Sequence, residues 1–295
     1  MKTTTKLREL IKSKELIVAP GAFSPLCAKM IQKVGFNCVY MSGYGVAAYR
    51  LGFPDVGLMT MNESLDTARA IAQACDLPVI ADVDNGYGNV INVKRTVEEY
   101  ELAGVAGIQL EDQSWPKRCG HMEGKVLISA EEMVQKIRIA VASRKDPDFV
   151  IVARTDANTV LGFDEAIRRS NLYAEAGADI IFFESPTSDE QVEKIPDLVH
   201  APVMLNMSEG AKTPLRNNAE IRSLGYKLVI WPSSATWAAA RAIQEIYQIL
   251  KDKGTTGEDL EKLILFHEFN DLIGLPEVMR LSDEYKTGTT YGGVR

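Results

Sequence analysis

Short apolar segments rich in β-branched residues recur along the first 231 residues, separated by amphipathic segments. The amphipathic segments repeat their apolar residues with helical spacing, which predicts helices that include residues 64–74, 93–103, 131–143, 164–176 and 189–198. We predict one strand from each apolar segment: 16–20, 38–42, 78–82, 107–111, 149–154, 180–184, 202–206 and 227–231. Alternating strands and helices are typical of an α/β protein with a parallel sheet.

Polar side chains stand at the carboxyl end of nearly every predicted strand: Ser42, Asp82, Asp84, Glu111, Arg154, Glu184, Asn206 and Ser233. Emergence into solvent explains some of them, but not acids, an arginine and an asparagine beside isoleucine, valine and phenylalanine. In a closed (β/α)8 TIM-type barrel these ends meet on one face, where barrel enzymes carry out their chemistry. An open sheet would spread them along a line too long for one small ligand. Eight strands with this distribution favour the barrel.

The pattern changes beyond residue 235. Residues 236–251 predict one long helix, residues 254–257 interrupt it, and residues 258–270 predict a further helix. These helices exceed what eight strands require. We therefore predict a single barrel domain over residues 1–295, in which the extra helices of 236–295 pack on the barrel or on a neighbouring subunit.

Charge and composition exclude several classes of partner. The formal net charge is −7 and the isoelectric point is about 5.2, so a nucleic acid or an anionic membrane has no electrostatic support as a partner. No apolar run approaches the roughly 20 residues that cross a bilayer. No apolar signal region follows the first residues, and we expect a cytoplasmic protein. Cysteines 27, 38, 75 and 119 lack paired metal-ligand spacing and are expected to be free thiols.

Residues 111–121 gather acid–base groups in the loop after the fourth predicted strand. Lys117, Arg118, Cys119 and His121 combine two cations, a thiol and a titratable ring within five positions. Cationic neighbours lower the pKa of a thiol, so we expect the pKa of Cys119 to lie closer to neutrality than that of a free cysteine. An ordinary surface thiol is the alternative. The composition of this loop indicates half of an active site.

Three carboxylates are predicted to converge at the mouth of the barrel. Asp82 and Asp84 alternate at a strand end, which directs both side chains to one face, and Glu111 ends the next strand. Such carboxylates repel one another unless a cation lies among them. Oxygen ligands and few histidines favour Mg²⁺ or Mn²⁺ over zinc. The alternative is a set of solvent-facing acids or helix caps.

Several short motifs together are more specific than any one of them. They are Ser-Gly-Tyr-Gly at 42–45, Leu-Gly-Phe-Pro-Asp-Val-Gly at 51–57, Asp-Val-Asp-Asn-Gly-Tyr-Gly at 82–88, Glu-Asp-Gln at 111–113, Lys-Arg-Cys-Gly-His at 117–121, Ala-Arg-Thr-Asp-Ala at 153–157 and Asn-Met-Ser-Glu-Gly at 206–210. Through them the chain resembles the isocitrate lyase/phosphoenolpyruvate mutase superfamily. The Lys-Arg-Cys-Gly-His segment resembles the branch of 2-methylisocitrate lyase and 2,3-dimethylmalate lyase, and carboxyphosphonoenolpyruvate mutase shares it.

The resemblance implies a role for each matching residue. Asp82 would bind Mg²⁺ directly, with Asp84 and Glu111 acting largely through water. The substrate would meet the other matching residues: Ser42, Gly43 and Tyr44 at a carboxylate, Arg154 at the same unit, Asp55 near the alkoxide oxygen, and Glu184, Asn206 and His121 at the far end. Cys119 would be the acid–base on a closing loop, with Lys117 and Arg118 lowering its pKa and Arg118 also stabilising negative charge.

The function implied by the resemblance is a Mg²⁺-dependent carbon–carbon lyase. It would cleave a 2-hydroxy di- or tricarboxylate, similar to 2-methylisocitrate or 2,3-dimethylmalate, to an oxo acid and a carboxylate through an enolate that Cys119 protonates. The bulk of Tyr44 favours the shorter substrates. Two alternatives stay open, a phosphonomutase or hydrolase acting on a P–C bond and a barrel without catalytic activity. The resemblance also implies a homotetramer, a dimer of dimers with a swapped C-terminal helix.

Overall fold

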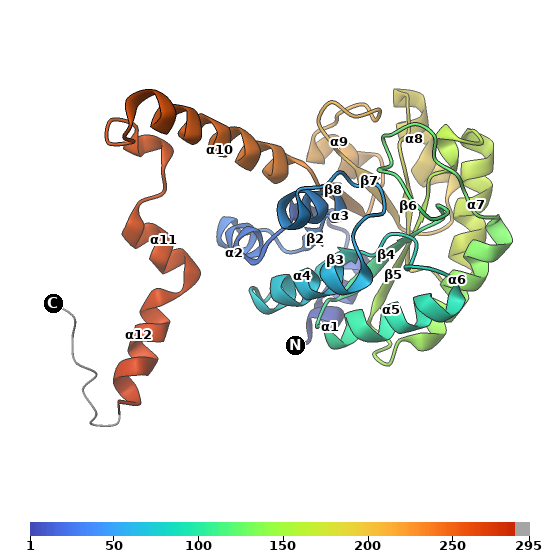
Figure 1. The fold of residues 1–295 in the computed structure, drawn as a ribbon. Coiled ribbons are helices and arrows are strands. Elements are labelled where there is room, and N and C mark those ends of the chain that lie inside the picture. The colour runs from blue at the N-terminus through green and yellow to red at the C-terminus, as the bar shows by residue number, and fades with distance from the viewer. Residues whose placement is uncertain (287–295) are drawn as a thin grey trace. The chain divides into compact units, whose positions relative to one another are not determined.

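The computed structural model describes residues 1–286 and divides the chain into two compact units, Met1–Ala239 and Ala240–Arg295. The first unit is a closed barrel of eight parallel strands that pair in sequence order (Figure 1). The strands are β1 (Ile17–Ala22), β2 (Val39–Met41), β3 (Val79–Asp82), β4 (Gly107–Glu111), β5 (Val150–Thr155), β6 (Ile180–Phe183), β7 (Val203–Asn206) and β8 (Leu228–Trp231). Pairing of β1 with β8 closes the barrel, with Ile17 opposite Leu228. The predicted (β/α)8 TIM-type fold is confirmed, and every predicted strand overlaps an observed one.

Helices surround this sheet (Figure 1). They are α1 (Thr3–Lys12), α2 (Pro25–Val34), α3 (Gly43–Val46), α4 (Met61–Gln73), α5 (Val90–Leu102), α6 (Ala130–Ser143), α7 (Phe163–Glu175), α8 (Asp189–Leu198) and α9 (Asn218–Ser223). Local sequence sets their ends. Thr60 and Glu63 form a reciprocal capping box at the start of α4, and Ser24 caps α2 directly before Pro25.

Apolar side chains fill two separate layers of the barrel unit. One layer lies inside the barrel and contains alternate strand residues such as Ile17, Ala19, Val150 and Val152, closed at one end by Leu7 of α1. The other layer lies between the strands and the surrounding helices. Because strand side chains alternate between these layers, the sheet is rigid on both faces. Chemistry is therefore left to the strand ends and the loops that follow them.

The C-terminal segment differs from its prediction in one place. Helix α10 (Ser234–Lys253) matches the long helix expected from the sequence, and α11 (Phe266–Ile273) and α12 (Leu275–Glu284) follow it. The helix predicted over residues 258–270 begins later than expected, at Phe266, because only a single turn forms at Leu260–Lys262 before α11. Asp259 lies 2.8 Å from the Lys253 ammonium, which ties this turn to the end of α10. Within residues 1–286, no helix combines the length and the apolar character needed to span a bilayer.

Candidate active site

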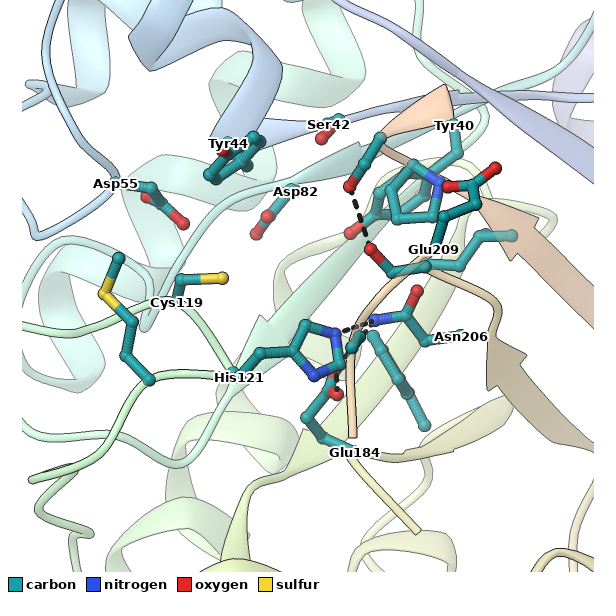
Figure 2. Close-up of a pocket in the computed structure, with 18 of the residues that line it drawn as sticks. Tyr40, Ser42, Tyr44, Asp55, Asp82, Cys119, His121, Glu184, Asn206 and Glu209 are labelled. Carbon is teal, nitrogen blue, oxygen red and sulfur yellow. Dashed lines mark hydrogen bonds and ion pairs between the residues drawn. The ribbon is translucent and has the colours of Figure 1, made fainter. Parts of the chain in front are cut away.

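A cavity of about 250 Å³ opens at the carboxyl ends of the barrel strands (Figure 2). Tyr40, Phe182 and Ile230, which belong to the interior layer of the barrel, form part of its lining. Nine of the residues predicted from the sequence also line it: Ser42, Tyr44, Asp55, Asp82, Cys119, His121, Arg154, Glu184 and Asn206. Strand ends and two loops thus bring together residues that are up to about 160 positions apart in the chain.

Next to this cavity lies a carboxylate cluster that consists of Asp55, Asp82, Asp84 and Glu111 around the ammonium group of Lys117. All five residues are buried. Lys117 donates a hydrogen bond to Asp55 and lies 2.7 Å from Oδ1 of Asp84. The loop of residues 111–121 therefore reaches back into the barrel mouth and supplies the cation that the predicted carboxylates require.

Asp84 joins the cluster by a geometry that strand alternation did not predict. Strand β3 ends at Asp82, and Asp84 has a φ of 51°, in the left-handed region. Its backbone N–H donates to Oδ1 of Asp82 at 3.1 Å, and its carbonyl accepts from the N–H of Glu111 at 2.9 Å. A non-glycine residue in this conformation is held at a cost by its surroundings, as often occurs in functional sites.

Burial shapes the pKa values in the cluster. It raises the pKa of Asp84 to about 7, with Lys117 opposing and Asp82 adding to the shift. It also raises the pKa of Asp82, and raises that of Glu111 well above its usual range despite Arg154 and Lys117. For Lys117 burial alone would lower the pKa, but Asp84, Asp55 and Glu111 raise it well above the ordinary value. The cluster therefore holds more buried carboxylate than its cations neutralise.

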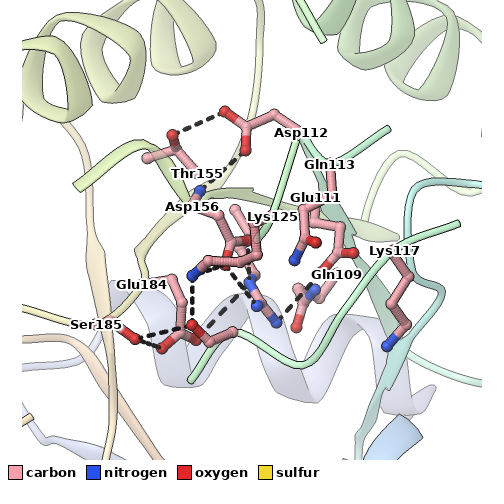
Figure 3. Close-up of polar contacts among 12 residues, drawn as sticks. Gln109, Glu111, Asp112, Gln113, Lys117, Lys125, Thr155, Asp156, Glu184 and Ser185 are labelled. Carbon is pink, nitrogen blue, oxygen red and sulfur yellow. Dashed lines mark hydrogen bonds and ion pairs between the residues drawn. The ribbon is translucent and has the colours of Figure 1, made fainter. Parts of the chain in front are cut away.

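Arg154 connects the cluster to the rest of the cavity. Its guanidinium donates to Asp156 at 2.8 and 3.0 Å, lies 3.4 Å from Glu111 and 3.7 Å from Glu184. Burial would raise the pKa of Asp156, but Arg154 and Lys125 outweigh it and lower the pKa to about 2. Lys125 donates to Asp156 at 3.0 Å and also to the carbonyl oxygen of Gly120 (Figure 3). This buried network links the loop to the strand end that carries Arg154.

A second buried network supports the first from behind. Asp112 accepts hydrogen bonds from the Thr155 hydroxyl at 2.8 Å and from the backbone N–H of Asp156 at 2.9 Å (Figure 3). It also accepts from Arg169 at 3.0 Å and from Tyr173 at 2.8 Å, both on α7. The ends of β4 and β5 are thereby fixed to each other and to a helix, which limits movement of Glu111 and Arg154.

The loop backbone packs directly on two cavity residues at Gly120. A Cβ atom added at Gly120 would lie 2.4 Å from Nη2 of Arg154 and 2.8 Å from Cγ of Glu184. Only glycine permits this approach. Two contacts fix the orientation of the next side chain, His121. Its Nδ1 lies 3.2 Å from the Ser185 hydroxyl, and its Nε2 lies 3.3 Å from the Asn206 amide nitrogen. The Ser185 hydroxyl lies 2.7 Å from Glu184, so the ends of β6 and β7 position this imidazole.

Cys119 faces the cavity beside Asp55 and His121 (Figure 2). The expectation of a lowered pKa is wrong for this thiol. Burial and the negative charge of Asp55 raise its pKa to about 11, and Arg154 only partly opposes them. The cations expected to lower the pKa are engaged elsewhere, because Lys117 is paired with carboxylates and the exposed Arg118 donates to the carbonyl of Glu123 at 3.0 Å.

Comparisons with known proteins agree with this geometry. Residues 7–251 match the family model described as phosphoenolpyruvate phosphomutase. The chain is 50% identical over 288 residues to 2,3-dimethylmalate lyase of Eubacterium barkeri, covering 98% of this chain and 100% of that protein. It is 46% identical over 268 residues to 2-methylisocitrate lyase of Aeropyrum pernix, covering 91% of this chain and 86% of that protein.

A crystal structure of 2,3-dimethylmalate lyase, described as a PEP mutase/isocitrate lyase superfamily member, is also similar. It superposes with a TM-score of 0.92 at 37% identity, covering 100% of this chain and 99% of that one. The chain belongs to the PEP mutase/isocitrate lyase superfamily. The resemblance expected from the sequence motifs is confirmed. The close relatives named as lyases make this chain a lyase of that superfamily.

The superfamily provides a comparison for the carboxylate cluster. Phosphonopyruvate hydrolase, which superposes with a TM-score of 0.87 at 32% identity over 97% of this chain and 99% of that one, was solved with oxalate and Mg²⁺. In the present chain the carboxylate oxygens of the cluster, among them the unpartnered Oε1 of Glu111, are donors that fit a cation in addition to Lys117. No three His, Cys, Asp or Glu side chains of residues 1–286 approach closely enough to ligate one ion together. Mg²⁺ is commonly bound through one or two carboxylates and keeps several waters.

The remaining predicted residues lie as follows. Gly43 begins α3, and a Cβ atom there would lie 2.8 Å from Oδ2 of Asp82. Ser42 caps the same helix by accepting from the Gly45 N–H at 3.3 Å. Arg118 is outside the cavity lining. Sequence reasoning assigned no role to Lys125, Asp156, Ser208 or Glu209, although the last three lie within the motifs at 153–157 and 206–210.

Proposed function

We propose that this superfamily member cleaves the carbon–carbon bond next to the hydroxyl-bearing carbon of a 2-hydroxy di- or tricarboxylate similar to 2,3-dimethylmalate or 2-methylisocitrate. The products are an oxo acid and a carboxylate. The observation that carries the proposal is that the thiol of Cys119 faces the same cavity as Ser42, Asp82 and Arg154. The enolate formed by carbon–carbon cleavage requires a proton donor at its carbon, whereas hydrolysis or phosphoryl transfer does not.

The oxo-acid half of the substrate would bind at the start of α3 and at Arg154. The hydroxyl of Ser42 and the backbone N–H groups of Gly43 and Tyr44 are available for one carboxylate, and the Arg154 guanidinium adds a permanent positive charge. Asp82 would hold Mg²⁺ or Mn²⁺ with Asp84 and Glu111 behind it, and the ion would supply a Lewis acid for the developing oxyanion.

Bond cleavage needs one proton acceptor and one proton donor. Asp55 lines the cavity and accepts the hydroxyl proton, so the oxygen forms a carbonyl and the electron pair of the broken bond moves to the neighbouring carbon. The resulting carboxylate enolate is stabilised by His121 and Asn206, which are fixed in the cavity before the reaction. Cys119 then transfers the proton from Sγ to the enolate carbon. A pKa of about 11 keeps that proton on sulfur at neutral pH until the enolate forms.

The loop that carries Cys119 also excludes water. The N–H of Cys119 donates to the carbonyl of Asp55 at 3.1 Å, and Lys117 and Lys125 anchor the loop on either side of it. A closed loop protects an enolate from protonation by solvent.

Turnover of a substrate panel tests the proposal. Purified enzyme with Mg²⁺ is incubated with 2,3-dimethylmalate, 2-methylmalate, 2-methylisocitrate and phosphonopyruvate, and released oxo acid is measured by coupled reduction. We expect oxo acid from at least one hydroxy acid and loss of that activity in Cys119→Ala. Full cleavage activity in Cys119→Ala, or oxo acid from phosphonopyruvate alone, would reject the carbon–carbon lyase and favour P–C bond chemistry. No turnover of any of these compounds would reject the proposed substrate class.

We also propose that copies of the chain cover the apolar residues of the second unit in a homotetramer. Large apolar side chains on this unit are exposed, including Phe266 at 84%, Tyr247 at 68%, Val278 at 60% and Tyr285 at 73%. Exposed apolar residues in this number are typical of a subunit interface. Light scattering coupled to size exclusion tests this, since a monomeric mass would reject it.

A further inference from the structure

The cavity has an outer wall that the proposed chemistry does not use, formed by Tyr44, Trp237, Ser233 and Glu209. Trp237, in the first turn of α10, is 39% exposed, whereas Asp82 at the carboxylate cluster is 7% exposed. The Trp237 ring meets the Tyr44 ring edge-on, with centroids 6.3 Å apart and an angle of 83° between the planes. The outer wall is therefore aromatic where the inner end is ionic.

The polar groups of this outer wall either form hydrogen bonds with neighbouring side chains or can only accept hydrogen bonds. The indole N–H of Trp237 donates to the Tyr44 hydroxyl at 3.3 Å, and the hydroxyls of Ser208 and Ser233 lie 3.1 Å apart. One oxygen of Glu209 accepts from Ser234, and the other is buried without a partner. The outer wall thus offers neutral hydroxyls and a carboxylate, but no cation.

The charges of the whole lining set a limit on the ligand. Among the lining residues Arg154 is the single arginine or lysine, and Asp156, Glu111 and Glu184 already surround its guanidinium. The donors at the start of α3 can hold one carboxylate, and His121 with Asn206 can hold a second. A third carboxylate would face aromatic rings and Glu209 without a counter-charge, which is unfavourable in a desolvated pocket.

The outer wall is also fixed in position. Helix α3, which carries Tyr44, is pressed against the first turn of α10, because a Cβ atom added at Gly45 would lie 2.8 Å from Oγ1 of Thr236. The hydroxyl of Tyr49 donates to the carbonyl of Thr236 at 2.9 Å, and its ring stacks on Phe23 with centroids 4.0 Å apart. Tyr44 and Trp237 therefore cannot separate to admit a larger group without breaking these contacts.

We propose that Tyr44 and Trp237 restrict the substrate to dicarboxylates that carry an alkyl group toward the outer wall, and that they exclude tricarboxylates. This inference rests on the proposed lyase function and narrows its substrate class. Trp237 is a specificity-determining residue in this assignment, because the position that would need a cation for a third carboxylate holds an indole.

Exchange of Trp237 tests the inference. Values of kcat/KM are measured for 2,3-dimethylmalate and 2-methylisocitrate with wild type, Trp237→Arg and Trp237→Phe. We expect wild type to favour the dicarboxylate by at least about 100-fold. Trp237→Arg should raise the tricarboxylate value at least about tenfold and lower the dicarboxylate value, since a charge-assisted hydrogen bond is gained. Trp237→Phe should keep the preference. Trp231→Phe, a half-buried tryptophan outside the lining, serves as the control and should leave both values within about twofold.

Binding measurements separate this inference from the lyase function. Calorimetry with Mg²⁺ compares methylsuccinate with tricarballylate, neither of which can be cleaved. If wild type prefers methylsuccinate and Trp237→Arg reverses the order, the inference holds even where no hydroxy acid is turned over. Equal or better use of the tricarboxylate by wild type, or equal changes for both ligands in Trp237→Arg, would overturn it.

Discussion

The two ends of the cavity differ in how they are built. The inner end is the carboxylate cluster, where Asp82 and Glu111 end rigid strands and the buried Lys117 pairs with carboxylates of the cluster. The two rings of the outer wall come from a four-residue helix and the first turn of α10, and the Trp237 ring is partly exposed. The inner end is suited to developing charge, because its charges are buried and fixed in advance. The outer wall is suited to discriminating between substrates by size and charge.

This comparison implies a separation of effects. Changes at the inner end should lower kcat for every substrate, since they act on the step that all substrates share. Changes at the outer wall should alter which substrate is used.

The largest effect is expected from Asp82→Asn. The side chain keeps its size but loses the charge that would hold a divalent cation. We expect kcat to fall at least about 10³-fold, because a Lewis acid contributes several kcal/mol and each 1.4 kcal/mol is a factor of ten. Mn²⁺ binding, followed by electron paramagnetic resonance, should weaken in parallel. Unchanged Mn²⁺ affinity together with full activity would show that the cluster is not a metal site.

Cys119→Ala is expected to have the next largest effect. Removal of a positioned proton donor lowers kcat by about 10²-fold or more. The fall should be similar for every cleaved substrate, because the thiol acts on the shared enolate carbon. Proton exchange at the α-carbon of the product carboxylate, measured by NMR in deuterated water, should be lost as well. Loss of activity toward one substrate only would place Cys119 among the specificity residues instead.

These two residues also mark what the sequence could predict. Strand ends carry polar side chains at positions that hydrophobic patterning locates, so the barrel, Asp82 and Arg154 were found from the chain alone. The direction of the Cys119 pKa shift could not be predicted from the chain, because it depends on burial and on Asp55, which is 64 positions away in sequence. Lys117 was expected to act on the thiol, and its pairing with Asp84 becomes visible only in three dimensions. Lys125 carries no local signal of its contacts with Gly120 and Asp156.

A smaller effect is expected from Lys125→Met. Its ammonium donates to the Gly120 carbonyl and to Asp156, so it holds the loop in position. Lys125 does not itself line the cavity. We expect kcat to fall about 10- to 100-fold, as for other misplacements of reacting groups, with a smaller change in KM. Alkylation of Cys119 by iodoacetamide at fixed pH should become faster as the loop opens. A change in thermal stability alone, with kcat and alkylation unaltered, would limit Lys125 to a structural role.

The smallest expected effect is a pH dependence of the metal-free enzyme that originates in the carboxylate cluster. Burial raises the pKa of Asp84 to about 7, against about 3.9 in an unfolded chain. Between these values the folded state binds more protons than the unfolded state, so stability present below pH 4 is lost as pH rises through 7. We expect the free energy of unfolding in EDTA to fall by about 1–2 kcal/mol between pH 5.5 and 7.5, measured by urea denaturation.

In Asp84→Asn the dependence of the unfolding free energy on pH should become weaker, and Mg²⁺ at pH 7.5 should restore the stability of the wild type. Tyr44→Phe, at the outer wall, should leave the slope unchanged, and an equal change there would remove the distinction between the two ends.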